Sequence, residues 1–383
     1  MRKVALVTCF LDNCGACLQA YALQSSIQKF GLTCEIIKYI GPDGYDHRTL
    51  PRRIISGLAK NRFTFGFLSL FSSKIKGKYY IKTKSLKFDR FRRKQLCFTK
   101  KRYFSFDELD SAVLDYDGFV AGSDQIWNPT FYNGNNRVYF LDFVKESKPR
   151  IAYAPSIGIT AIPKEYEDDF RTLVNKFDYL SVREQKGVEI ISKYSDRECR
   201  LVLDPTLLLT GDEWIKRFKT HNKKRKYILL YLFGEREYYQ NFINCVTAKL
   251  GLEIVCIPFT EKDSQNSKYR RVFDAGPIDF LSLVSNASLV ITDSFHATVF
   301  SILFGTPFYT LLRGDPSDPK NMNERIFSLL NIVELTDRIV SKFNSSFSFS
   351  TEMDFSIAQA KIAELRRSSI AYLKEALGEN DKD

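Results

Sequence analysis

Short apolar runs rich in β-branched and aromatic residues alternate along this chain with longer segments of helical periodicity, and this alternation is the strongest constraint on its fold. Strands that are separated by helices form mostly parallel sheets with helices on their faces. We therefore expect an α/β protein. The runs that predict strands are residues 3–10, 33–39, 118–121, 150–154, 179–182, 227–233, 253–257, 288–292 and 308–312.

The chain of 383 residues is long enough for two such α/β units, which side by side create a cleft. A charged stretch at 219–226 precedes the apolar run YILLYLF, so we place an N-terminal domain at 1–222 and a C-terminal domain at 223–345. Beyond them, apolar residues at helical spacing predict a long C-terminal helix over 354–378.

The positive charge of the chain is concentrated in one segment. There are 57 Lys and Arg residues against 45 Asp and Glu, a formal net charge of +12. Residues 48–102 carry 18 of these basic residues and a single acidic one, Asp89, so the rest of the chain has a small acidic excess. A basic surface spread over the whole protein is therefore disfavoured, and we expect no nucleic-acid partner.

The sequence shows no sign of export or membrane insertion. Its eight cysteines are too sparse for a disulfide scaffold. The first apolar run meets Asp12 before any cleavage pattern of a signal peptide. The most apolar later stretch, 297–312, is interrupted by Gly305 and Pro307 and is shorter than a membrane helix. We expect a cytoplasmic protein.

Polar residues follow several of the predicted strands. Ligands of open α/β sheets bind in the loops beyond the carboxyl ends of the strands, and a helix N-terminus in such a loop attracts anions. Asp204 and Arg313 also stand in loops of this kind. The residues that we take as candidates for the site are Asn13, Gly15, Ser123, Asp124, Gln125, Arg183, Ser294, His296, Asn323 and Arg325.

Three of these candidates have an alternative interpretation. His296 opens an apolar helix, where it is either a structural residue or a group facing the cleft beside the helix dipole. Asp124 either caps its own turn or takes part in chemistry. Arg325 either binds an anion or belongs to a solvated helix face.

Other motifs have little support. Cys14 and Cys17 form a C-x-x-C, but no second pair or spaced histidines follow, so we expect no metal site. Asp115 and Asp117 form a D-x-D that precedes its strand instead of following it. Walker and G-x-G-x-x-G motifs for nucleotides are missing from the sequence. We expect no cofactor.

Several of these segments together resemble the polysaccharide pyruvyl transferase family. The matching segments are, in order, NCGACLQAYALQ, DYDGFVAGSDQIWNPTF, IAYAPSIG, LSVREQKGVEII, VLDPTLLL, ASLVITDSFHATVFSILFGTPFYTL and NERIFSLL. They extend from about residue 3 to residue 330. Three departures stand out. Cys14 and Cys17 lie where relatives often have other small or aromatic residues, Ser294 lies where some members have arginine, and residues 48–102 contain no family motif.

The resemblance implies two Rossmann-like domains facing a cleft, as in the GT-B fold. It also implies transfer of the pyruvyl group of phosphoenolpyruvate to two hydroxyls of a sugar in a surface, exopolysaccharide or capsular polysaccharide precursor, giving a cyclic ketal and phosphate. Sugars on a polyprenyl diphosphate carrier are one form of acceptor. Phosphoenolpyruvate is a donor substrate here, and no metal or other cofactor is needed.

On this interpretation His296 is the general acid/base, and Asp124 accepts a proton from an acceptor hydroxyl or holds the sugar. Arg183 and Arg325 bind the carboxylate or phosphate of phosphoenolpyruvate. The remaining candidates position or bind substrate, namely Ser123, Gln125, Asn13, Gly15, Ser294 and Asn323.

Residues 48–102 form a basic insert. Within it, residues 52–80 interleave Lys and Arg with large apolar side chains, which is typical of segments that lie on anionic membranes. One hypothesis is that this segment docks the protein on the inner face of the membrane. The other is that it packs its aromatic rings into the core or a dimer interface and leaves its charges in water.

Two other functions compete with pyruvyl transfer. A GT-B glycosyltransferase that uses a nucleotide sugar would share the architecture. A non-enzymatic scaffold on the membrane, held by the basic insert, would need none of the cleft chemistry.

Overall fold

The computed structural model of the protein describes residues 2–40, 73–131, 136–145, 147–220, 226–234, 237–259, 263, 265–314, 322–343, 347 and 349–379, without the side chains of 73–81. Within these residues the chain forms parallel sheets of five and six strands and a small sheet of two, with helices on their faces. The predicted α/β class is confirmed.

The first sheet has the strand order β3-β2-β1-β4-β5, and all its pairs are parallel. Its strands are β1 (Lys3–Val7), β2 (Thr33–Tyr39), β3 (Phe98–Tyr103), β4 (Gly118–Ala121) and β5 (Arg150–Ala152). The small sheet pairs β6 (Leu180–Val182) with β7 (Cys199–Leu201). The helices around them are α1 (Cys14–Lys29), α4 (Ser73–Gln95), α5 (Phe106–Asp110), α6 (Glu167–Val174), α7 (Gln185–Ile191) and α8 (Gly211–Phe218), with 3₁₀ helices η1 (Pro129–Phe131), η2 (Lys164–Tyr166) and η3 (Pro205–Leu208).

The second sheet has the order β10-β9-β8-β11-β12-β13 and is also parallel. Its strands are β8 (Tyr227–Tyr231), β9 (Glu253–Cys256), β10 (Arg270–Arg271), β11 (Leu289–Thr292), β12 (Phe308–Leu311) and β13 (Ile339–Val340). Its helices are α9 (Glu237–Leu250), α11 (Pro277–Asn286), α12 (Phe295–Leu303), α13 (Glu324–Ile332) and the 3₁₀ helix η4 (Thr336–Arg338), followed by α14 (Ser356–Ala376). The predicted domain boundary at 222 falls in 221–225, outside the described residues.

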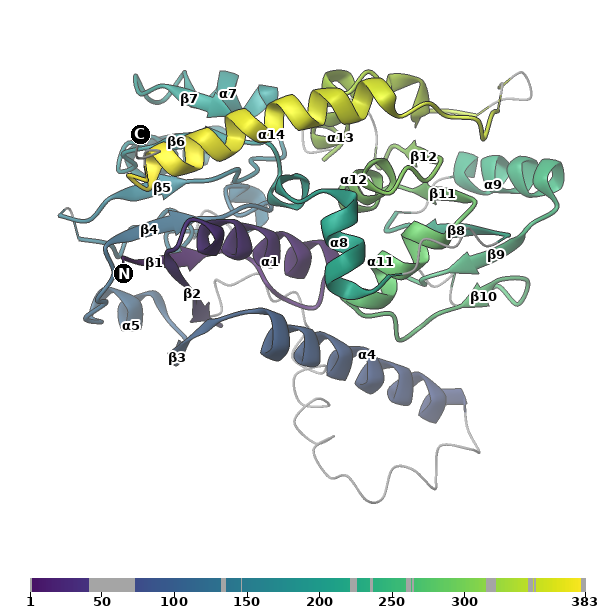
Figure 1. Cartoon of the computed structure of the whole chain (residues 1–383), viewed down its shortest axis with the longest axis horizontal. Coiled ribbons are helices and arrows are strands. Elements are labelled where there is room, and N and C mark those ends of the chain that lie inside the picture. The colour runs from purple at the N-terminus through teal and green to yellow at the C-terminus, as the bar shows by residue number, and fades with distance from the viewer. Residues whose placement is uncertain are drawn as a thin grey trace.

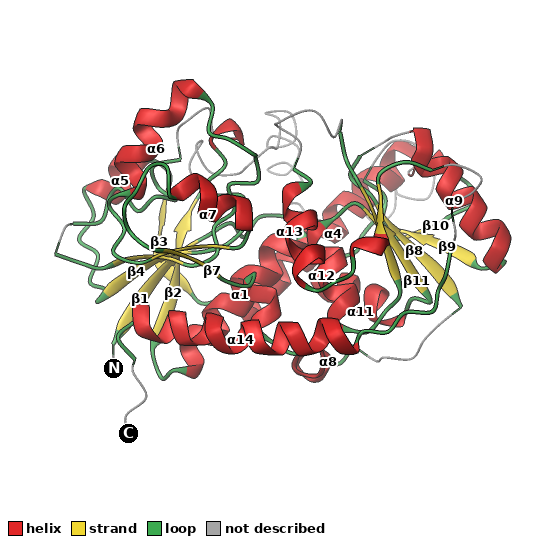
Figure 2. Ribbon diagram, turned by 90° about the horizontal axis from the view of Figure 1, so that it is seen from above, coloured by secondary structure: helices red, strands yellow, loops and turns green. Residues whose placement is uncertain are grey.

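One apolar core continues from the first domain into the second. Trp214 of α8 is completely buried between Tyr21 of α1 and Phe300 of α12, at ring-centroid distances of 5.6 and 5.1 Å. Figure 2 shows α1, α8, α11, α12 and α14 between the two sheets. Because α1 and α12 pack on this shared core, it fixes them relative to one another, although they belong to different domains.

The long C-terminal helix extends across both domains and ends against the first (Figure 1). Near its end, the hydroxyl of Tyr372 donates to the carbonyl of Ala152 in β5 at 2.9 Å. Arg2 Nη2 donates to the carbonyl of Leu377 at 2.6 Å. The predicted helix is therefore present, and it ties the second domain back to the first.

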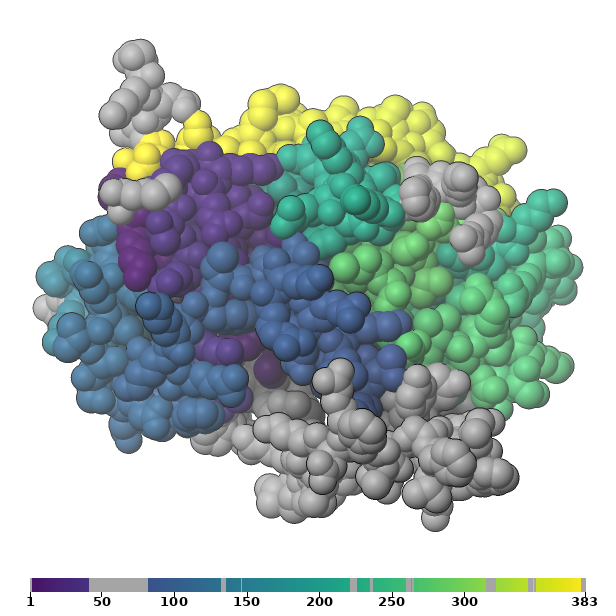
Figure 3. Space-filling view, turned by 60° about the horizontal axis from the view of Figure 1, so that its bottom comes forward, coloured from purple at the N-terminus to yellow at the C-terminus, as the bar shows by residue number. Residues whose placement is uncertain are grey.

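The carboxyl end of the basic insert belongs to the first domain, because β3 begins inside the predicted range 48–102, ends one residue beyond it and extends the first sheet. Helix α4 reaches the second domain, and in Figure 3 the blue surface of the first domain borders the green surface of the second. There Lys87 Nζ lies 2.9 Å from Asp274 and 3.0 Å from Asp279. Of the segment proposed for membrane contact, 52–72 and the side chains of 73–80 lie outside the described residues. In the part of the chain that is described, no helix has the length and apolar character of a membrane span.

Candidate active site

The N-termini of α1 and α12 meet between the domains. Asn13 caps α1 by accepting from the amide of Ala16 at 3.2 Å, and Ser294 caps α12 by accepting from the amide of Ala297 at 3.4 Å. Gly15 lies so close to His296 that a Cβ on residue 15 would be 2.1 Å from Nδ1 of the imidazole. His296 is 7% exposed. The two caps therefore shape the helix ends, and Gly15 makes room for the histidine.

Asp204 forms the centre of the buried polar cluster. It follows β7 and caps η3, where Oδ1 accepts from the amide and the hydroxyl of Thr206 at 2.9 and 2.6 Å. Its other oxygen, Oδ2, accepts from Ser123 Oγ at 3.0 Å and from Arg183 Nη1 at 2.5 Å. His296 Nε2 lies 3.7 Å from the same oxygen. Loops after β4, β6, β7 and β11 thus converge on one carboxylate.

The charges in this cluster are strongly coupled. Burial by itself raises the pKa of Asp204, but the charge of Arg183 and the imidazole of His296 hold it well below its ordinary range. Burial raises the pKa of Glu184, although Arg183 Nε donates to its Oε1 at 3.2 Å. The fully buried Arg183 therefore has one firmly ionised partner and one that resists ionisation.

A second buried guanidinium, that of Arg325, also lies near the Phe295 ring. Cζ of Arg183 is 4.6 Å and Cζ of Arg325 is 5.9 Å from the ring centroid. Burial and the charges of Arg183 and Arg313 lower the pKa of Arg325 to about 10. Because these cations repel one another, the arrangement favours a bound anion that would offset the repulsion.

Some buried hydrogen-bond donors of this cluster have no acceptor within the described residues. Among the described residues, Arg183 Nη2, His296 Nε2 and Gln125 Nε2 are buried and make no hydrogen bond. Asp124 Oδ1 lies 3.7 Å from Arg183 Nη2. Buried donors are nearly always satisfied in native proteins, so this group indicates a place where a ligand can supply acceptors.

Asp124 has a left-handed backbone with φ of 75°, and its Oδ1 accepts from the amide of Gln125 at 2.9 Å. Both interpretations of this residue fit its geometry, because a carboxylate that caps its own turn also lies near Arg183. The side chain of Gln125 packs against Gly158, where a Cβ would be 2.3 Å from Nε2.

Two other predicted substrate-binding residues make their contacts within the protein. Ser123 is fully buried and accepts from Arg183 Nη1 at 3.1 Å while it donates to Asp204. Asn323 accepts from the amide of Arg313 at 3.0 Å and donates to its carbonyl at 2.7 Å. Ser123 thus orients the charged pair, and Asn323 fixes the loop after β12.

Reasoning from the sequence assigned no role to Asp204, Glu184 and Phe295, which complete the cluster, or to Asp293. Asp293 accepts from the amides of Phe233 and Gly234 at 2.8 and 2.7 Å and lies 3.7 Å from Arg313 Nε. Only their position in the sequence could have indicated them, because each of these residues stands in a loop beyond a strand or next to a predicted site residue.

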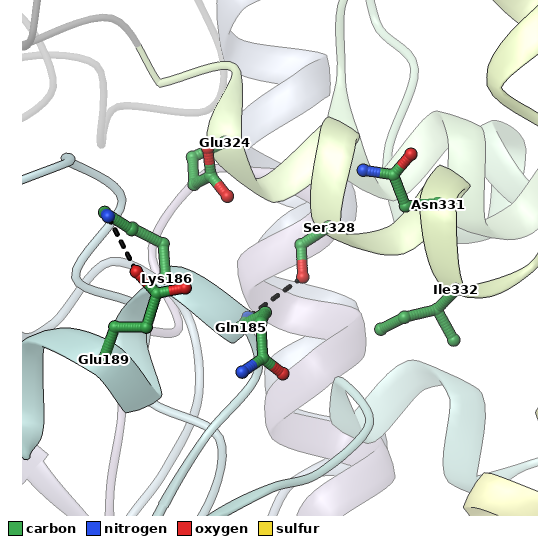
Figure 4. Close-up of a pocket in the computed structure, with 7 residues that line it drawn as sticks. All are labelled: Gln185, Lys186, Glu189, Glu324, Ser328, Asn331 and Ile332. Carbon is green, nitrogen blue, oxygen red and sulfur yellow. Dashed lines mark hydrogen bonds and ion pairs between the residues drawn. The ribbon is translucent and has the colours of Figure 1, made fainter.

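A groove of about 370 Å³ opens beside the cluster, between α7 of the first domain and α13 of the second (Figure 4). The amide of Gln185 donates to Ser328 Oγ at 3.1 Å across it, and Lys186 Nζ pairs with Glu189 at 2.7 Å. Its lining residues are Gln185, Lys186, Glu189, Glu324, Ser328, Asn331 and Ile332.

The two motifs with little support have structural contacts. Cys17 Sγ donates to the carbonyls of Phe10 and Leu11 at 3.4 and 3.3 Å, and burial raises the pKa of Cys14 to about 12. Asp117 accepts from the amide of Lys3 at 2.7 Å, at the amino end of β1 and therefore away from the cluster.

Solved structures match this chain over nearly its whole length at low sequence identity. UDP-GlcNAc 2-epimerase from Methanocaldococcus jannaschii is 13% identical with a TM-score of 0.42, covering 95% of this chain and 99% of its own. Arabidopsis thaliana UGT89C1 in complex with quercetin is 11% identical with a TM-score of 0.45, covering 98% and 94%. Acinetobacter baumannii MurG is 10% identical with a TM-score of 0.44, covering 99% and 100%. None of the curated proteins compared with the chain matches it.

In this structure the loops at the carboxyl ends of both large sheets face one another across the cluster, as the predicted GT-B-like arrangement requires. The family model described as polysaccharide pyruvyl transferase matches residues 13–315, a range that includes Gly15, Asp204 and His296. The chain therefore belongs to the polysaccharide pyruvyl transferase family, which implies that it is a transferase.

Proposed function

We propose that this protein transfers the pyruvyl group of phosphoenolpyruvate to two hydroxyls of a sugar, forming a cyclic ketal and releasing phosphate. One observation carries the proposal: two buried guanidiniums, Arg183 and Arg325, lie at the ring of Phe295, the residue directly before His296. Phosphoenolpyruvate bears a phosphate and a carboxylate, so it offers two anionic groups to two cations next to a proton donor.

The donor would bind through groups that have hydrogen-bonding capacity left. The planar fork of Arg183 matches a carboxylate or phosphate oxygen through Nη2. Arg325 would supply the second charge, and the N-terminus of α12 adds the positive end of a helix dipole. Asp204 keeps Arg183 in place through its 2.5 Å contact.

The chemistry needs an acid and a base in this setting. Protonated His296 would give its proton to C3 of the enol, making C2 electrophilic like an oxocarbenium ion. One sugar hydroxyl then adds to C2, the bond from C2 to the phosphate oxygen breaks, and the second hydroxyl closes the ketal. Of the two protons that the hydroxyls release, one would pass by way of Asp124 back to His296, and the other would leave with phosphate.

The proposal is tested by supplying either phosphoenolpyruvate or nucleotide sugars with a glycan acceptor. We expect phosphate release from phosphoenolpyruvate and a product heavier by one pyruvyl ketal. Release of a nucleoside diphosphate instead would identify a GT-B glycosyltransferase. His296→Ala should lose ketal formation, and full activity in that variant would contradict the assigned acid.

The acceptor and the place of the reaction are part of the same proposal. The acceptor is a sugar of a surface or capsular polysaccharide precursor, with a polyprenyl diphosphate carrier as one form, and the reaction takes place on the cytoplasmic side of the membrane. Contact of residues 52–80 with anionic lipid is tested by co-sedimentation with anionic liposomes. Unchanged binding after charge reversal of this segment would refute that contact. A scaffold without enzymatic activity is excluded if His296→Ala binds membranes normally yet forms no ketal.

A further inference from the structure

We infer that the groove between α7 and α13 binds uncharged sugar units of the acceptor glycan, next to the unit that receives the pyruvyl group. The inference rests on the proposed function and adds the substrate class and location of a second subsite. It assigns donor and acceptor to different surfaces, the donor to the buried cations and the glycan to the groove.

On both walls of the groove, a lining residue is the chain neighbour of a residue of the buried cluster. On the first domain, Gln185 follows Arg183 and Glu184 directly at the start of α7. On the second domain, Glu324 is the residue before Arg325 at the start of α13. Glu184 also contributes to the raised pKa of Glu324, which indicates that the two carboxyls lie near one another where the walls meet the cluster. A glycan in the groove can therefore reach the cluster with its end unit.

The lining has the chemistry of a site for hydroxyl groups. The side chains of Gln185 and Asn331 each offer a donor and an acceptor, and Glu324 offers acceptors only. Ile332 adds an apolar surface on the same wall, beside Asn331 in Figure 4. A volume of about 370 Å³ is within the roughly 300–1,000 Å³ of small-ligand sites, which lie preferentially at domain interfaces.

The charge of the groove argues against an anionic ligand. Lys186 is paired with Glu189 at 2.7 Å, and no cation of the described residues lies within ion-pair distance of Glu324. Burial raises the pKa of Glu324, and the negative charges of Glu184 and Glu189 raise it further against the opposing charge of Lys186. A phosphate or carboxylate would add negative charge beside these carboxyls, whereas a neutral polyhydroxylated ring would not.

The test uses the intact chain and a variant that fills the groove. Asn331 is exposed on α13, so Asn331→Trp places an indole in the groove without burying new polar groups. Gln359→Trp makes the same change at an exposed amide on α14 and is the matched control. Labelled protein is applied to arrays of neutral and acidic oligosaccharides, and phosphoenolpyruvate binding is measured separately by thermal shift.

We expect wild type and Gln359→Trp to bind neutral oligosaccharides in preference to acidic ones, and Asn331→Trp to bind them at least about tenfold more weakly. Phosphoenolpyruvate should raise the melting temperatures of wild type and of both variants equally. Binding of neutral oligosaccharides that survives Asn331→Trp, or a wild type that binds none of them while it binds phosphoenolpyruvate, overturns the inference. Wild type that binds neutral glycans but not phosphoenolpyruvate refutes the proposed donor and leaves the groove assignment standing.

Discussion

Gly15, at the start of α1 in the first domain, lies against the imidazole of His296, at the start of α12 in the second. A Cβ on residue 15 would be 2.1 Å from Nδ1 and 2.5 Å from Cγ of the ring. The position of the proposed acid therefore depends on a glycine more than 280 positions earlier in the sequence.

The first prediction concerns this contact. Gly15→Ala should displace His296 or α1 by a fraction of an ångström to an ångström, and such a displacement costs roughly 10²-fold in rate. We expect kcat of ketal formation to fall to that extent. Steady-state kinetics with phosphoenolpyruvate measures the effect.

Gly31→Ala is the control for this prediction. Gly31 has φ of +80° and open space around it, so alanine there strains the backbone by about 1 kcal/mol without touching the site. It should lower stability and leave kcat unchanged. Equal losses of kcat in both variants would show that Gly15 acts only through general stability.

The second prediction concerns the cost of holding Arg325 as a cation. Because burial and the neighbouring guanidiniums lower its pKa to about 10, the charge destabilises the free protein. Arg325→Met keeps most of the volume and removes the charge, so we expect it to stabilise the free protein by about 1 kcal/mol or more. The same change should weaken phosphoenolpyruvate binding by at least about tenfold.

Thermal unfolding with and without phosphoenolpyruvate checks both effects in one experiment. Phosphoenolpyruvate should raise the melting temperature of wild type. Arg325→Met should have a higher melting temperature than wild type without the ligand, and the ligand should raise it by less. Arg200→Met, which removes a half-buried arginine outside the cluster that pairs with Glu375 at 2.6 Å, serves as the control, and phosphoenolpyruvate should stabilise it as much as wild type. The anion-binding role would be refuted if Arg325→Met melted at a lower temperature than wild type and phosphoenolpyruvate raised both melting temperatures equally.

The third prediction follows from the low pKa of Asp204. Its folded-state pKa lies below the value of about 3.9 in an unfolded chain, so the folded protein binds fewer protons there. The resulting stability is present above about pH 4 and is lost as pH falls towards the folded pKa. Asp204→Asn should therefore lose stability less steeply than wild type on acidification below about pH 5.

At pH 7 the same variant should be less stable by about 3–5 kcal/mol, since Arg183 would be left buried without its ionised partner. Urea unfolding at a series of pH values measures both the offset and the slope. Asp196→Asn changes an exposed carboxylate and should follow the wild-type curve. An Asp204→Asn curve parallel to wild type would contradict the assignment.

The sequence predicted the elements whose signal is local. Apolar runs such as YILLYLF are recognised as strands because a parallel strand is buried on both faces. The edge strand β3, FTKKRY, was missed inside the basic insert because three of its residues are exposed and only two of its side chains are buried. The two-residue strands β10 and β13 are too short to leave a pattern.

The site was predictable as a set of loops but not as a network. Rules for α/β sheets point to the loop that carries Ser123 and to the loop that carries Arg183. They do not show that Asp204 joins the two, because its contact with Ser123 spans 81 positions. Such a contact depends on the packing of whole domains. The pairing of Gly15 with His296 was out of reach for the same reason.

The last prediction links the shared core to the site. The indole Nε1 of Trp214 donates to the carbonyl of Thr206 at 3.1 Å, and Thr206 donates twice to Asp204. Trp214→Phe removes this hydrogen bond and part of the buried volume, so we expect a loss of about 1–3 kcal/mol in unfolding free energy. Because η3 would lose support beneath Asp204, KM for phosphoenolpyruvate should rise as well. Phe242→Leu, in the separate apolar cluster of the second domain, should cost comparable stability with unchanged KM. If KM is also unchanged in Trp214→Phe, the shared core supports the fold but does not affect phosphoenolpyruvate binding at the cations.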